Sequence, residues 1–236
     1  MLTPHRTCQR SDQRRGQQEA WLTFSAQADN DPKLEGFGGL AVLDEFRLPP
    51  GGIISGDASR EGELITYVFE GTLRYRDSLG RASAMQAGEF RRMSVGRGVR
   101  SSESNSSRTD WTRLFRVGLG SSAGLQCDPE QCDPEQKRFS VAQRRDGLCL
   151  IASAVARAGS LRIRADALLY SALLRPGQHH VHQLSPGRRA WLHVVTGEVA
   201  LRDLLLTSGD AVGISAEHAV SFTARTEAEV LLADVI

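Results

Sequence analysis

The chain has 236 residues, with 29 Lys and Arg against 28 Asp and Glu, so its net charge is +1. This balance argues against general electrostatic attraction to nucleic acid or membranes, and no apolar run approaches the ~20 residues that a membrane-spanning helix needs. Aromatic residues are few, at 6%, and 23 glycines separate many short apolar runs, which favours an all-β protein with tight turns.

The N-terminal segment is polar and rich in arginine. Residues 1–18 lack the apolar core of a secretory signal, so we expect a cytoplasmic protein. We predict that residues 1–20 are loosely ordered or form one edge strand. The cysteines do not form the pattern of a disulfide framework in a chain of this length, and reduced thiols agree with a cytoplasmic location. They are Cys8, Cys127, Cys132 and Cys149.

Short apolar runs, bounded by Gly and Pro, predict the strands of the first half. These are residues 21–25, 40–48, 64–70, 72–77, 99–105 and 111–119, with a turn at Gly71. The same order returns later, because residues 190–201 correspond to residues 63–73 and the Gly209-Asp210 corner corresponds to Gly88-Glu89. A β-unit of ~100 residues that occurs twice predicts two barrels in one chain.

The stretch from Gly51 to Gly71 has the spacing of a metal-binding β-hairpin. Five residues separate Gly51 from Asp57, Ser59 follows one residue later, and Glu63 starts the next strand. Metal barrels of the cupin type carry His-x-His where this chain has Asp57-Ala-Ser59. The scaffold of a metal site is therefore expected without its imidazoles.

A perfect tandem repeat, Gln-Cys-Asp-Pro-Glu, joins the two halves at residues 126–135. Cys127 and Cys132 could bind a metal ion or form a disulfide, but a zinc site needs further well-spaced ligands and none lies nearby. We interpret the repeat as a small duplication in a surface loop.

Three segments in the expected order resemble the pirin family: residues 64–80, 87–105 and 184–199. The resemblance extends over about residues 36–236. It implies an all-β bicupin, in which two antiparallel β-barrels (double-stranded β-helices) pack together. The expected divisions are an N-terminal arm at 1–36, an N-terminal cupin domain at 37–121, a linker at 122–140 and a C-terminal cupin domain at 141–236.

The resemblance also implies where a metal would bind. Pirins hold it with three His and one Glu, and these positions fall here on Asp57, Ser59, Ser101 and Glu103. Only the glutamate is retained, and a neutral Ser hydroxyl is a much weaker ligand than imidazole for a transition metal. We therefore predict a degenerate site without a metal cofactor, in which the remaining carboxylates pair with Ser hydroxyls or with a nearby arginine. The candidate arginines are Arg60 and Arg100.

A second candidate metal site lies in the other half. His180 and His182 alternate on a predicted strand, and His218 follows the second Gly-Asp corner. Pirins carry no metal in this domain, and no glutamate follows His182 at the expected offset. We prefer to interpret these residues as a polar loop.

The leading hypothesis is a pirin-like protein that binds a small molecule in the N-terminal barrel or acts as a regulator, rather than an enzyme. We expect no nucleic-acid or membrane partner, and a monomer or weak homodimer. The alternative is a quercetin 2,3-dioxygenase with a divalent metal, iron or similar, in which Glu103 accepts the proton of the flavonol enol. A protein-interaction module is a third possibility that rests on the fold alone.

Overall fold

The computed structural model describes residues 1–24, 36–57, 62–95, 100–120, 134–145 and 147–236. Nearly all regular elements in these ranges are β-strands. The helices among them are one short α-helix and two 3-10 turns, namely α1 (Val141–Arg145), η1 (Thr7–Gln9) and η4 (Arg157–Gly159). None of these described helices is long and apolar enough to cross a membrane. The all-β prediction is confirmed.

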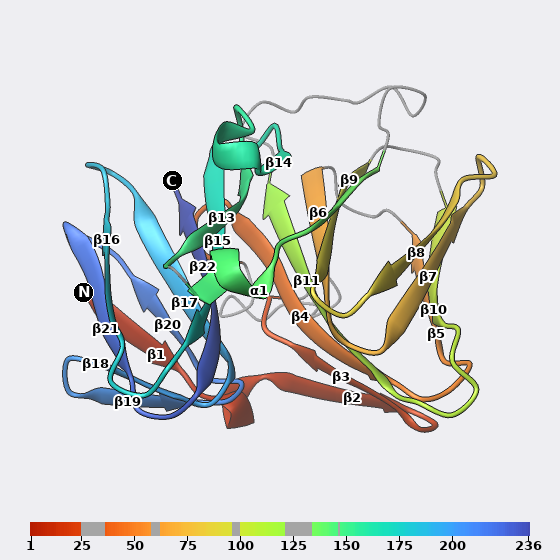
Figure 1. Ribbon diagram of the computed structural model, residues 1–236, viewed down its shortest axis with the longest axis horizontal. Coiled ribbons are helices and arrows are strands. Elements are labelled where there is room, and N and C mark those ends of the chain that lie inside the picture. The colour runs from red at the N-terminus through yellow and green to blue at the C-terminus, as the bar shows by residue number, and fades with distance from the viewer. Residues whose placement is uncertain (25–35, 58–61, 96–99, 121–133, 146) are drawn as a thin grey trace. The chain divides into compact units, whose positions relative to one another are not determined.

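The chain forms two compact units. The N-terminal unit contains Ser11–Arg138 and Leu161–Ala165, and the C-terminal unit contains Met1–Arg10, Phe139–Ser160 and Asp166–Ile236. Within each unit the strands form two facing sheets (Figure 1). The predicted two-domain cupin fold is therefore present, but the sheets are layered and do not close into barrels.

The N-terminal unit combines a four-stranded and a seven-stranded sheet. The smaller sheet has the order β5 (Ile53–Asp57), β10 (Arg100–Asn105), β7 (Thr72–Asp77) and β8 (Ala82–Gln86). The larger has the order β12 (Glu135–Arg138), β9 (Glu89–Val95), β6 (Gly62–Glu70), β11 (Thr112–Gly120), β4 (Leu40–Leu48), β3 (Gln18–Leu22) and β2 (Ser11–Arg15). The short strand β14 (Leu161–Arg162) also belongs to this unit.

The C-terminal unit repeats this arrangement. Its smaller sheet has the order β16 (His179–Gln183), β21 (Ala219–Ala224), β18 (Glu198–Leu201) and β19 (Leu204–Thr207). Its larger sheet contains β1 (Leu2–His5), β20 (Ala211–Ile214), β17 (Arg189–Thr196), β22 (Ala228–Val235), β15 (Ala167–Leu174) and β13 (Cys149–Ser153) in this order. The orders of the two smaller sheets match one for one, and those of the larger sheets match over these six strands, as the internal repeat predicted.

Equivalent glycines make the tight turns that the sequence predicted. Gly71 joins β6 to β7 with φ +80°, and Gly197 joins β17 to β18 with φ +83°. A methyl group on either would collide with a backbone carbonyl oxygen, that of Trp111 or of Glu227 respectively. Glycine is therefore required at both positions by conformation and by space.

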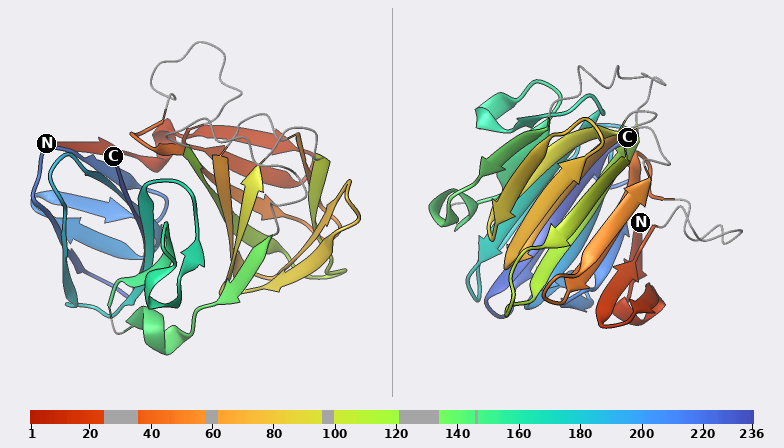
Figure 2. Two further views of the ribbon diagram at one scale, coloured as in Figure 1. Left: turned by 90° about the horizontal axis from the view of Figure 1, so that it is seen from above. Right: turned by 90° about the vertical axis from the view of Figure 1, so that its right-hand side faces the viewer.

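The N-terminal arm is more ordered than predicted, since residues 1–20 contain β1 and β2 and the start of β3. β1 pairs antiparallel with β20, from Leu2 opposite Ile214 to His5 opposite Ala211, and extends the larger sheet of the C-terminal unit (Figure 2). The first ten residues thus belong to the C-terminal unit, although they precede the N-terminal unit in the chain.

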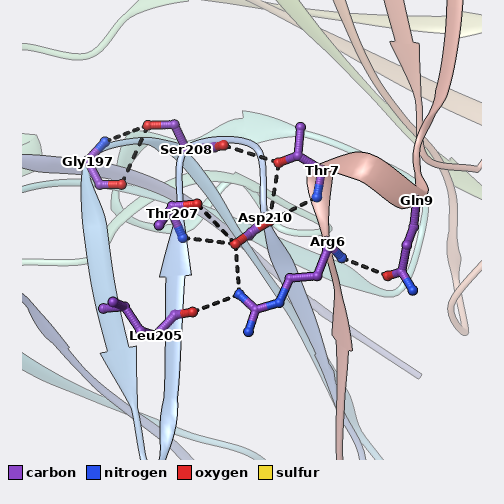
Figure 3. Close-up of polar contacts among 8 residues, drawn as sticks. All are labelled: Arg6, Thr7, Gln9, Gly197, Leu205, Thr207, Ser208 and Asp210. Carbon is purple, nitrogen blue, oxygen red and sulfur yellow. Dashed lines mark hydrogen bonds and ion pairs between the residues drawn. The ribbon is translucent and has the colours of Figure 1, made fainter.

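A buried carboxylate at the predicted Gly-Asp corner holds this arm (Figure 3). Asp210 accepts hydrogen bonds from Arg6 Nη1 at 2.8 Å and from the backbone N–H of Thr7 at 2.9 Å. The backbone N–H of Thr207 donates to the same carboxylate at 3.1 Å, and Arg6 also donates to the Leu205 carbonyl at 2.7 Å. These bonds replace the loose order expected of a polar terminus.

The tryptophans differ in burial. Trp191 is fully buried, whereas Trp111 is 37% exposed and lies under the Arg47 guanidinium, 4.8 Å from its ring centre. Cys149 is half-buried, and burial raises the pKa of its thiol. Cys127 and Cys132 lie outside the described residues.

Candidate functional site

The β5–β10 pair brings three of the four predicted ligand positions to one part of the smaller sheet. Ser101 and Glu103 are two residues apart on β10, so their side chains point to the same face. Asp57 ends β5 opposite Arg100, which places its backbone beside Ser101. Ser59 lies outside the described residues. The structure therefore supports the predicted neighbourhood of these positions, whereas the identity of their ligand remains a prediction.

Glu103 is the buried centre of this region, and its side chain is only 3% exposed. Its Oε2 accepts hydrogen bonds from Arg116 on β11, at 3.0 Å from Nε and 2.6 Å from Nη2. Its Oε1 accepts one from the Thr66 hydroxyl on β6 at 3.2 Å and forms an ion pair with Arg91 on β9. Three strands of the larger sheet thus hold a carboxylate that projects from the smaller sheet.

These partners keep Glu103 ionised. Burial alone would raise the pKa of its carboxyl group, but the charges of Arg116 and Arg91, together with the hydrogen bonds, outweigh burial and lower the pKa below its usual value. Glu103 is therefore a carboxylate throughout the neutral range. It can serve as an anionic ligand or as a weak base.

Tyr75 supports the cluster from β7. The Arg91 guanidinium stacks on its ring at 4.4 Å, and its hydroxyl donates a hydrogen bond of 2.9 Å to Asp77. Burial and the neighbouring Asp77 carboxylate raise the pKa of Tyr75, so the phenol stays protonated at neutral pH. Arg81 Nε forms an ion pair with Asp77 Oδ2 at 2.7 Å. Asp77 is therefore neutralised by Arg81, whereas Glu103 is neutralised by Arg91 and Arg116.

The arginines that bind Glu103 differ from those that the sequence suggested. Arg60 lies outside the described residues, and Arg100 is exposed, with its backbone N–H bonded to Ser78 Oγ at 3.2 Å. Alternation along β11 would have indicated Arg116, because it lies two residues after the buried Leu114 and faces the same way. An arginine on the apolar face of a strand requires a buried partner of opposite charge. This pattern in the sequence could have identified Arg116 as the partner of Glu103.

The alternative histidine site does not assemble. His180 and His182 share the inward face of β16, whereas His218 is exposed in the turn before β21. The His182 Nε2 atom lies 2.8 Å from Asp234 Oδ2, and the His180 Nε2 atom lies 3.0 Å from the Gln178 amide. These two imidazoles therefore have separate hydrogen-bond partners within the C-terminal unit.

The described side chains do not fit a tight transition-metal site. They contain no group of three His, Cys, Asp or Glu residues that could hold an ion. Glu103 offers one carboxylate that is already paired with two cations, and the Ser101 hydroxyl is a weak ligand.

The two units, with matching sheet orders and a retained glutamate in the first, define a bicupin. Comparison with known families agrees, since the pirin family model matches residues 6–117, and a model described as the quercetinase C-terminal cupin domain matches residues 150–235. The chain belongs to the pirin family.

Relatives resemble the chain over its whole length. Quercetin 2,3-dioxygenase from Escherichia coli K12 is 34% identical, and the match covers 100% of this chain and 99% of that protein. The crystal structure of YhhW from Escherichia coli has a TM-score of 0.89 and 32% identity, with 100% and 98% of the two chains covered. The bacterial pirin YhhW in complex with nickel(II) has a TM-score of 0.88 at the same identity, with 100% and 99% covered.

The nickel(II) complex contradicts our expectation that this protein needs no cofactor. A pirin that is 32% identical to this chain binds a metal ion, and two relatives that are 34% identical carry the name quercetin 2,3-dioxygenase. These findings point to a metal cofactor. They also favour the enzymatic alternative over the leading hypothesis of a binding or regulatory protein.

Proposed function

We propose that this chain is an oxidoreductase of the quercetin 2,3-dioxygenase type, with a divalent metal ion as cofactor. The observation that carries the proposal is full-length similarity to a quercetin 2,3-dioxygenase together with the retained Glu103. Metal chemistry would supply the activation of the flavonol and of oxygen. The poor donor set in the described chain predicts weak metal binding, so activity should require added metal.

Glu103 is the residue to which we assign proton transfer. A carboxylate with a lowered pKa is ionised at neutral pH and can accept the proton of an acidic enol hydroxyl. Its Oε2 becomes available only when Arg116 releases it, because that oxygen accepts two hydrogen bonds from the guanidinium. Access of the substrate hydroxyl to Oε2 must therefore be coupled to movement of Arg116.

The test is loss of the flavonol absorbance band, with oxygen uptake measured in parallel. Protein is incubated with quercetin and Fe(II), Cu(II), Ni(II) or Mn(II) in turn. We expect turnover with at least one of these ions, and we expect Glu103→Gln to lower kcat by about 100-fold or more, the usual range for loss of an acid–base group. No turnover with any of these ions would reject the proposed function.

Glu229→Gln is the matched control. Glu229 is also a buried glutamate, paired with Arg144, but it lies in the C-terminal unit. The Glu229→Gln variant should be less stable than wild type and should still turn over the flavonol with the same metal. Equal loss of activity in the two variants would mean that Glu103 acts through stability and not through chemistry.

A further inference from the structure

Arg116 is the partner of Glu103 that can leave it. The Arg91 side chain is 1% exposed, whereas the Arg116 side chain is 16% exposed and lies over the Phe46 ring, 5.1 Å from its centre. When Arg116 turns away, Arg91 and Thr66 still bind Oε1. Glu103 therefore keeps its position and presents Oε2 to a ligand.

Ionised Glu103 supplies the negative charge with which two buried arginines are paired. Both Arg91 and Arg116 form ion pairs with it. Asp44 lies opposite Arg116 in the pairing of β11 with β4 and faces the same interior, as alternation with the buried Phe46 requires. A proton that passes to Glu103 removes the charge that both arginines share, and a buried ion pair that loses one partner is strongly destabilised.

An ionised hydroxyl of the ligand replaces the lost charge. The enol hydroxyl of a flavonol gives its proton to Oε2 of Glu103, so that the ligand O–H bond breaks, an O–H bond forms on the carboxyl group, and the negative charge moves to the ligand oxygen. Arg116 then donates to that oxygen the two hydrogen bonds that Oε2 accepted before. Among the described side chains, the buried Nε of Arg91 also has no hydrogen-bond partner, so the cluster holds an unfilled donor.

We propose that Arg116 selects ligands with an acidic hydroxyl: it exchanges Oε2 of Glu103 for the ligand oxyanion as the proton passes to Glu103. The inference rests on the proposed function, because it names the ligand chemistry of that same site. It assigns to Arg116 a specificity role that the sequence did not suggest. Related ligands that lack the acidic hydroxyl should therefore bind weakly.

Titration with two flavonoids tests this assignment, with protein as purified, without oxygen or added metal. Quercetin carries the enol hydroxyl, and the flavone luteolin lacks only that group. Wild type should bind quercetin about tenfold more tightly than luteolin or better, as expected for hydrogen bonds to a charged group. The absorbance band of bound quercetin should move to longer wavelength, because the hydroxyl is ionised.

Arg116→Met removes the guanidinium but keeps an apolar side chain of similar length. This variant should bind the two flavonoids with equal affinity and without the shift of the absorbance band. Equal affinities in wild type would overturn the proposal. A wild-type preference that survives in Arg116→Met would also overturn it, because Arg116 would then turn to another partner, such as Asp44.

The fate of the proton distinguishes the exchange from simple binding of an anion. In wild type the proton stays in the complex on Glu103, so the quercetin affinity should be constant across the weakly acid pH range. Glu103→Gln cannot take the proton and keeps both arginines, so it should release one proton for each quercetin bound. Its affinity should rise about tenfold per pH unit. A rise of this size in wild type would mean that Glu103 does not accept the proton, and would refute the exchange.

Two further variants separate this role from loss of stability. Arg113→Met removes the same group from the opposite face of β11, where Arg113 pairs with Glu45 at 2.7 Å, and should keep the wild-type preference for quercetin. Arg116→Lys keeps the charge without the two-pronged contact and should keep part of the preference. If Arg113→Met abolishes the preference as fully as Arg116→Met, general charge or stability is responsible and the specific exchange is refuted.

Failure of this inference can be told from failure of the proposed function. Binding is measured without oxygen or added metal, whereas the function is measured by turnover. Selective binding of quercetin without turnover by any of the tested ions would support the exchange and reject the dioxygenase. Turnover by a protein that binds quercetin and luteolin equally would do the reverse.

Discussion

The two units build the same sheet order around different interiors. Between the sheets of the N-terminal unit lies the charged cluster of Arg91, Glu103 and Arg116. Between those of the C-terminal unit lies a large apolar cluster, which includes Leu192 and Leu232. Strand order and turn glycines thus define the scaffold of both units, whereas the inward-facing residues of a few strands determine which chemical groups each interior contains.

The interiors also differ in how they remain stable. Apolar contacts tolerate small rearrangements, but buried charges are stable only while each has its partner. In the C-terminal unit Asp234 binds His182 at 2.8 Å and Arg188 at 2.5 Å, and Glu229 forms a second buried ion pair with Arg144. In the N-terminal unit the charged group contains the family's glutamate. Substitutions in the two interiors should therefore have effects of different size and origin.

The largest effect is expected from Glu103→Ala. This change leaves the buried Arg91 without its carboxylate, and removal of one partner from a buried ion pair costs roughly 3–5 kcal/mol of unfolding free energy. Urea denaturation followed by circular dichroism measures the loss. A destabilisation below about 1 kcal/mol would mean that water reaches the cluster and that the N-terminal interior is not the dry, charged site described above.

A smaller effect, of about 3 kcal/mol, is expected from Leu232→Ala in the C-terminal interior. Leu232 is fully buried on β22, and its truncation leaves a cavity in the apolar cluster. Leu232→Met keeps the volume and should cost less than about 1.5 kcal/mol in the same urea experiment. Equal losses of unfolding free energy in the two variants would show that the shape of the side chain at this position matters as much as its volume.

Local patterns allowed the sequence to predict most of the scaffold. Alternation of apolar and polar residues predicted β4, β6 and β7, and a glycine between two such runs predicted the turns at Gly71 and Gly197. These signals extend over only a few residues. The retained Glu103 was found through its motif. Its partners were missed, because β10 belongs to the smaller sheet whereas Arg91 and Arg116 come from the larger one. Contacts between facing sheets are not encoded in the period of either strand.

The N-terminal arm was missed for a similar reason. Arg6 and Asp210 are 204 residues apart, and nothing in the polar segment predicts that it will complete a sheet at the other end of the chain. The cofactor prediction was wrong for another reason, because it treated the number of retained ligands as decisive. A relative of similar length binds nickel(II).

An effect smaller than that of Leu232→Ala, about 2 kcal/mol, is expected from Asp210→Asn. The amide keeps the shape of the side chain but loses the charge that accepts bonds from Arg6, Thr7 and Thr207, and hydrogen bonds to charged groups contribute roughly 1.5–3 kcal/mol. Hydrogen exchange should accelerate at β1, and trypsin should cleave near Arg6 before the rest of the C-terminal unit. Unchanged protection of β1 would mean that its pairing with β20 suffices.

The pH dependence of this difference tests the charge itself. Burial would raise the pKa of Asp210, but the backbone N–H groups of Thr207 and Thr7 and the Arg6 side chain outweigh it, so the folded pKa lies below the usual value. Its stabilisation is therefore complete above the unfolded pKa of about 3.9 and disappears as the pH falls through the lower, folded pKa. Wild type and Asp210→Asn should differ in urea stability at pH 7 and converge in acid. A difference that stays constant down to the lowest pH at which both proteins fold would assign the effect to geometry, because a protonated carboxyl group and an amide are both neutral.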